Sequence, residues 1–198
     1  MTRRMSLRTG VATATLTAAW ATPAWAHAVT TGMGPFYDGV AHLLLTPEDA
    51  VILVAVALYA GLRGAAAGRA AMFLLPTAWL LAGLIGSAAG PPLPAPVPAL
   101  TFLVAGALVA ADARLSFRGV VALVIAVGLL HGYANGVAFR GPGSTVEMLG
   151  VVMTTWVAVA LLAALVVSLR RAWARIAVRV AGSWIAASGL LLLGWTLR

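Results

Sequence analysis

The sequence predicts an all-α membrane protein, a polytopic bundle of six transmembrane helices that follows a cleavable signal peptide. Hydrophobic residues make up 62% of the 198 residues and charged residues only 9%, whereas roughly a quarter of the residues in an average soluble domain are charged. Apolar runs recur along the chain and are separated by short segments rich in arginine, glycine and proline. Runs of this kind are typical of helices that cross a bilayer.

Residues 1–26 have the features of a signal peptide. The stretch "MTRRMSLRTG" is basic, residues 11–20 form a modest apolar core, and Ala-Trp-Ala at 24–26 matches a cleavage signal. A retained first membrane helix is the alternative, but this run is shorter than the usual ~20 residues and contains three threonines. Cleavage would make His27 the N-terminus, where its amine and imidazole either assist metal binding or have no role.

Residues 27–198 form one predicted membrane domain with six apolar runs. They lie at residues 47–62, 70–89, 97–111, 119–139, 145–169 and 176–197. The first run is short for ~30 Å of hydrocarbon, so we expect it to begin below the membrane surface with residues 36–45 packed above it. The short connections predict that successive helices are antiparallel neighbours.

The arginines predict the orientation of the bundle. The loops after the first, third and fifth runs carry Arg63, Arg69, Arg114, Arg118, Arg170, Arg171, Arg175 and Arg179, whereas the other side has Arg140 and Arg198. The positive-inside rule then places both mature termini in the periplasm of a bacterium, with the chain in its inner membrane. Topology also explains the net charge of +8, because these arginines are dispersed and form no stripe that would bind a nucleic acid.

The run at 119–139 contains polar residues that demand an explanation. His131 and Asn135 are four residues apart, so both side chains project from one face of the helix, and His131 lies about 12 Å below its outer end. Ionisable groups inside a membrane are candidates for function. The alternative is that His131 only forms a hydrogen bond with a carboxylate of the first helix and holds two helices together. Gly128, Gly132 and Gly136 form a ridge on the same helix that would allow close packing, and we expect it to bring this helix toward the first one.

Several acids have a structural interpretation beside a functional one. Thr46 is a predicted N-cap, and Glu48 and Asp49 would then face the positive end of the helix dipole. Ser144 and Glu147 match a capping box for the fifth run.

Asp38 either pairs with His42 on one helical face or belongs to a turn with Gly39. The chain contains no cysteine, so any metal ligands must be nitrogen or oxygen atoms.

Two stretches resemble the HupE/UreJ family, which is associated with hydrogenase and urease maturation. The first helix of the family opens with Gly-Phe-x-His-Pro-x-x-Gly-x-Asp-His-Leu-Leu, and "GVAHLLLTPEDAV" runs in register with it from Gly39 and leads into "AVALYAG". The family pattern His-Gly-x-Ala-His-Gly is similar to "HGYANG", with Asn135 in place of the second histidine. The chain departs from the family where Leu43 replaces proline, Thr46 replaces glycine, Glu48 replaces aspartate and Asp49 replaces histidine.

The resemblance implies a permease that moves nickel or cobalt into the cell. The implied ligands are His42, Glu48, Asp49, His131 and Asn135, with His27 and Asp38 assisting at the entrance. Exchange of two imidazoles for a carboxylate and an amide shifts such a site toward harder cations, so the identity of the divalent metal stays open. The ion would be cargo, and we expect no permanent cofactor.

The alternative function is a non-transporting accessory or assembly protein of a metalloenzyme system, with maturation proteins as partners. An enzyme is not expected, because no H-E-x-x-H or comparable catalytic spacing occurs.

Overall fold

A computed structural model describes residues 30–197, and these residues form seven α-helices and no β-strand. The helices are α2 (Pro35–Leu45), α3 (Pro47–Leu62), α4 (Ala65–Ala89), α5 (Pro96–Ala110), α6 (Phe117–Ala138), α7 (Ser144–Ser168) and α8 (Ala172–Thr196). The predicted signal peptide and His27 lie outside the described residues. The all-helical fold class is confirmed, and α3 to α8 coincide with the six apolar runs to within a few residues.

Not all six runs are long enough to count as membrane spans. Among the described helices, α4, α6, α7 and α8 are long and apolar enough to cross a membrane, and α2 and α3 together make a fifth span if the bent pair is one unit. Helix α5 has 15 residues, which corresponds to about 22 Å of helix. The sixth predicted span is therefore not confirmed.

The bend between α2 and α3 follows from its sequence. Thr46 is extended, with φ −91° and ψ 103°, as expected for a residue that precedes a proline. Pro47 lacks an N–H and starts α3, and the two helices meet at 73°. Thr46 is the N-cap and Glu48 and Asp49 lie in the first turn, as predicted, but the Thr46 hydroxyl makes no capping hydrogen bond.

The start of α7 differs from the prediction. The N-cap is Gly143, in the left-handed conformation with φ 94°, and no side chain caps the helix. The predicted capping box of Ser144 and Glu147 is therefore wrong, because Ser144 is already the first helical residue. Gly143 accommodates the turn that a capping side chain would otherwise have fixed.

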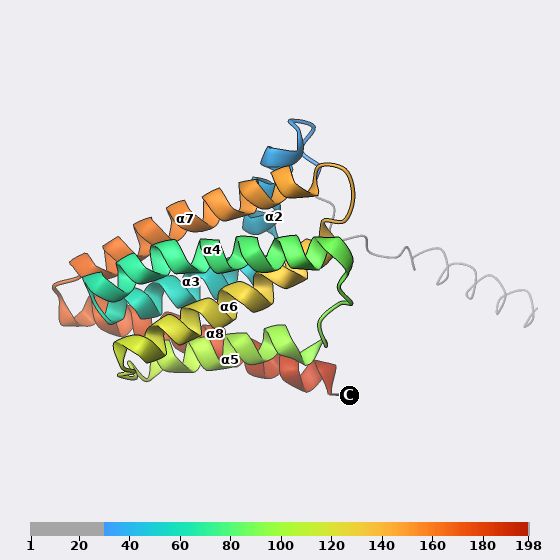
Figure 1. The fold of residues 1–198 in the computed structure, drawn as a ribbon. Helices are drawn as coiled ribbons and strands as arrows, with labels where there is room; N and C mark the ends of the chain where they lie inside the picture. Colours follow the sequence, from blue (N-terminus) through green and yellow to red (C-terminus); the bar gives the residue numbers. More distant parts are fainter. Residues whose placement is uncertain (1–29, 198) are drawn as a thin grey trace, which may run out of the picture.

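The helices run lengthwise through the bundle (Figure 1). The loops after α3, α5 and α7 lie together at one end, and the loops after α4 and α6 lie at the other end with the C-terminus. The first group consists of the predicted arginine-rich loops, so we call this end of the molecule the arginine end.

The glycine ridge of α6 is a packing surface, as predicted, but its partner is α4. A β-carbon on Gly132 would lie 2.2 Å from the carbonyl oxygen of Trp79, and one on Gly136 would lie 2.0 Å from that of Gly83. Helix α6 packs along α4 and touches α3 only locally. The expectation that the ridge brings α6 against the first apolar run is therefore wrong.

Candidate cation-binding site

Four of the five predicted ligands meet in one buried cluster. His42 comes from α2, Asp49 from the first turn of α3, and His131 and Asn135 from α6. All four are between 3% and 5% exposed. The bend at residues 46 and 47 makes this possible, because it sets the last turn of α2 beside the first turn of α3. We call these four residues the histidine cluster.

The carboxylate of Asp49 is the centre of the histidine cluster. Its Oδ1 atom lies 3.0 Å from His131 Nδ1, and its Oδ2 atom accepts a hydrogen bond of 2.7 Å from Asn135 Nδ2. His42 Nε2 approaches the same Oδ2 atom to 3.4 Å. The partners recorded for Asp49 are thus imidazoles and an amide, with no guanidinium among them.

His42 has unused hydrogen-bonding capacity. Its ring packs edge-on against Phe139, with the centroids 4.6 Å apart, and neither ring nitrogen has a hydrogen-bond partner in the part of the chain that the structure describes. The 3.4 Å approach to Asp49 brings the two groups close without the alignment of a hydrogen bond. A buried polar atom left unpaired costs about 1–3 kcal/mol, so the site holds an imidazole that an added ligand would stabilise.

Two residues that sequence analysis missed hold the α6 side chains in place. Trp79 of α4 donates from Nε1 to Asn135 Oδ1 over 3.3 Å, and the Thr101 hydroxyl of α5 lies 2.9 Å from His131 Nε2. No motif marks either residue, since each lies singly in an apolar run. The histidine cluster therefore draws on five helices, α2 to α6.

The hydrogen bonds constrain the protons on His131. An ionised Asp49 only accepts, so His131 Nδ1 donates to it, and in a neutral ring Nε2 then accepts from the Thr101 hydroxyl. That hydroxyl also lies 2.7 Å from the carbonyl oxygen of Pro98. The Thr101 hydroxyl therefore shares its single proton between His131 and Pro98. Through this hydroxyl the histidine cluster is joined to α5.

A cavity of about 470 Å³ adjoins the histidine cluster. All four cluster residues line it, together with Thr46, Glu48 and residues of the proline-rich segment before and within α5. Glu48 is exposed, so the cavity extends from the buried carboxylate toward the protein surface. The fifth predicted ligand therefore lies at this cavity but not within the hydrogen-bonded cluster.

The remaining predicted residue, Asp38, is engaged elsewhere. Asp38 and His42 both lie in α2, so the turn with Gly39 is wrong, but the carboxylate of Asp38 pairs with Thr31 and its predicted pairing with His42 is not confirmed. The Asp38 carboxylate accepts hydrogen bonds from the backbone N–H and the hydroxyl of Thr31, at 2.6 and 2.7 Å. It does not line the cavity.

The side chains of the histidine cluster contact one another and do not surround a common point at which a metal ion could bind. Within residues 30–197, no group of three or more His, Asp or Glu side chains is placed to hold a metal ion. Both oxygens of Asp49 instead accept hydrogen bonds within the histidine cluster. To ligate a cation, Asp49 and His131 would have to exchange their mutual hydrogen bond for bonds to the ion.

Comparison with known proteins gives one match. A family model described as HupE / UreJ protein matches residues 14–192, which is most of the chain. No curated protein and no solved structure matches. The resemblance that "HGYANG" and the stretch around His42 indicated is therefore confirmed over nearly the full length.

Proposed function

The chain belongs to the HupE/UreJ family, which is associated with nickel or cobalt transport or with accessory roles for urease and hydrogenase, and we propose that it is an inner-membrane permease. Its cargo is a divalent transition-metal ion taken from the periplasm, with nickel or cobalt favoured. The observation that carries the proposal is the buried Asp49 carboxylate, which faces imidazole and amide partners in the wall of a cavity. The family is one of transport and accessory proteins, not of catalysts.

Charge supports a cation as the cargo. Asp49 is ionisable and buried, and among residues 30–197 it contacts no arginine side chain. With both histidines neutral, the histidine cluster carries a negative charge in a low-dielectric environment, where attraction to a cation is strong. Glu48 adds a second carboxylate along the cavity and would attract the ion before it reaches Asp49.

The donor atoms suit a transition metal bound with moderate strength. His42 Nε2 and Asp49 Oδ2 would be the first ligands, because His42 has no hydrogen bond to give up. Imidazole nitrogen favours nickel and cobalt, whereas carboxylate and amide oxygen are harder donors. His131 and Asn135 would join only after releasing Asp49. That exchange weakens net binding, and weak binding is what a transported ion requires in order to leave.

The alternative, an accessory or assembly protein that does not transport, is favoured by one observation. Asp49, His131 and Asn135 already satisfy one another, so they can join α3 to α6 without any ion. His42 favours the permease. A cluster that only holds helices together would gain no stability from a buried imidazole that lacks hydrogen-bond partners.

Metal uptake by cells separates the two functions. Accumulation of nickel and cobalt is measured with and without the chain, and then with His131→Ala and Glu48→Gln. We expect His131→Ala to lower uptake about tenfold or more, as is usual when a group that orients or binds a metal is removed. Glu48→Gln should lower uptake mainly at low ion concentration, because the Glu48 carboxylate attracts the ion before the ion reaches Asp49.

Glu147→Gln is the matched control for Glu48→Gln. It removes the same charge at the same end of the bundle from a side chain that does not line the cavity, and because its charge acts only indirectly, through His42, it should lower uptake less than Glu48→Gln does. Wild-type uptake by a folded His131→Ala protein would support the accessory role and contradict the permease.

A further inference from the structure

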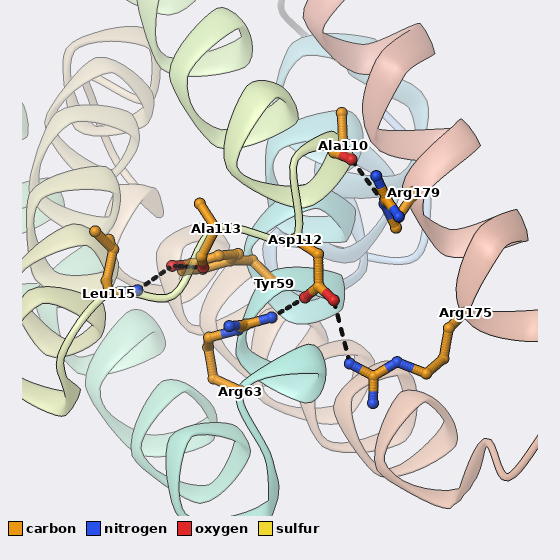
Figure 2. Close-up of polar contacts among 8 residues, drawn as sticks. All are labelled: Tyr59, Arg63, Ala110, Asp112, Ala113, Leu115, Arg175 and Arg179. Atoms are coloured by element: carbon orange, nitrogen blue, oxygen red, sulfur yellow. Dashed lines mark hydrogen bonds and ion pairs between the residues drawn. The ribbon is translucent and has the colours of Figure 1, made fainter. Parts of the chain in front are cut away.

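A second polar cluster lies at the arginine end (Figure 2). Asp112, in the loop between α5 and α6, accepts hydrogen bonds from Arg63 Nη2 and, at 3.3 Å, from Arg175 Nη2. These side chains and that of Arg114 line a cavity of about 430 Å³. Three arginines and one aspartate thus line this cavity, which leaves an excess of two positive charges. We call Arg63, Asp112, Arg114 and Arg175 the arginine cluster.

Arg63 is held in place but is not fully satisfied. Its side chain is only 10% exposed, and its guanidinium lies over the ring of Tyr59, 5.5 Å from the centroid. Its Nε atom is buried and has no hydrogen-bond partner. Burial lowers the pKa of Arg63, and the neighbouring Arg175 and Arg114 act in the same direction. A cation in this position would be stabilised by an anion that accepts from its free N–H.

Hydrogen bonds next to the cavity hold the segment around Asp112 in place. The Tyr59 hydroxyl donates to the carbonyl of Ala113 at 2.9 Å and accepts from the backbone N–H of Leu115 at 3.4 Å. Arg179 Nε donates to the carbonyl of Ala110 at 2.9 Å. Figure 2 shows these contacts joining α3 to the loop that carries Asp112, and α8 to the last residue of α5. The cavity is therefore preorganised, which limits the entropy lost on binding.

We propose that this cavity binds a phosphate group. Arginine binds phosphate oxygens with paired N–H donors, and the arginine cluster offers donors beyond those that Asp112 occupies. The cavity is larger than a phosphate ion needs, so either a free phosphate or the headgroup of an anionic phospholipid fits it. The proposal rests on the arginine cluster alone and does not depend on metal transport.

Titration of the purified full-length chain tests the proposal. The protein is placed in nanodiscs of neutral phosphatidylcholine and titrated with inorganic phosphate and, separately, with short-chain phosphatidylglycerol. Saturable binding of at least one probe is expected. Arg175→Gln and Arg114→Gln should each weaken it about tenfold or more, because each removes a charge-assisted hydrogen bond.

Arg118→Gln is the matched control. Arg118 is exposed at the same end of the bundle and does not line the cavity, so its loss should change affinity less than about twofold. Arg114 is exposed and has no recorded hydrogen bond to Asp112, so its variant remains informative if Arg175→Gln fails to fold.

The outcomes distinguish the source of the phosphate group. Binding of both probes supports a phosphate ion as the ligand, and binding of phosphatidylglycerol alone supports a lipid headgroup. Absence of saturable binding overturns the proposal. It is also overturned if Arg118→Gln weakens binding as much as the other two variants, since the effect would then be a diffuse surface potential. Neither result bears on metal uptake.

Discussion

The two polar clusters are each built around one aspartate, at opposite ends of the same helix. Asp49 lies in the first turn of α3, and Arg63, which binds Asp112, directly follows its last residue. The two carboxylates differ in their partners. Asp49 is 3% exposed and contacts imidazoles and an amide, whereas the Asp112 side chain is 26% exposed and contacts two guanidinium groups.

The partners of a carboxylate therefore decide which ion a site attracts. The histidine cluster keeps a negative charge because its partners can be neutral, so it suits a cation. The arginine cluster has more positive than negative charge, so it suits an anion. The dipole of α3 acts in the same sense at both ends, because its N-terminus favours the Asp49 carboxylate and its C-terminus favours the Arg63 guanidinium.

Exchange of each aspartate for asparagine is the strongest test of this contrast. Asp49→Asn removes the carboxylate charge of the histidine cluster and a ligand that we propose. We expect binding of nickel and cobalt to the purified protein to weaken about a hundredfold, with uptake falling to the level of cells without the chain. Asp112→Asn removes the same charge at the other end and should leave metal binding within about twofold. Metal titration and elemental analysis of cells measure both effects, and equal losses in the two variants would remove the distinction between the clusters.

Gly132→Ala should disturb one cluster and spare the other. The new β-carbon would lie 2.2 Å from the Trp79 carbonyl oxygen, so α6 must move away from α4 at a cost of about 1–3 kcal/mol. His131 and Asn135 move with α6, and metal binding should weaken, while phosphate binding at the arginine end is retained.

Gly194→Ala is the control for this substitution, because no heavy atom lies within 4 Å of its added β-carbon. Thermal unfolding in detergent checks the stability of both variants. A Gly132→Ala protein as stable as the Gly194→Ala protein would contradict the close packing of α4 and α6.

The features that local sequence determines were predicted well. Apolar runs predicted the helices, because an apolar segment is stable in lipid. Arginine-rich loops stay outside the lipid on one side, and they predicted which loops share the arginine end. His131 and Asn135 were found because a four-residue spacing fixes their common face within a helix. The capping box at Ser144 failed for a local reason as well, since Gly143 reached the left-handed conformation one residue earlier.

The features that depend on which helices meet were not predictable from one sequence. A glycine ridge signals close packing but does not name its partner, so α4 was missed. Trp79 and Thr101 lie 56 and 30 residues from the side chains they contact, and neither carries a motif. The arginine cluster was not predicted either, because topology alone explained these arginines, whereas the fold brings Arg63 and Arg175 to Asp112 and places Arg114 in the wall of the same cavity.

Thr101→Val should have the smallest effect and bears on how the histidine cluster is held. Valine has nearly the shape of threonine but leaves His131 Nε2 without its partner at 2.9 Å, at a cost of about 1 kcal/mol. We expect metal affinity to fall several-fold, because the ring is less firmly oriented. Thr154→Val is the control, since the Thr154 hydroxyl bonds only the Gly150 carbonyl of its own helix. Comparable metal affinities in the two valine variants would show that Thr101 does not position His131, whereas loss confined to Thr101→Val, with phosphate binding intact, would place it in the histidine cluster.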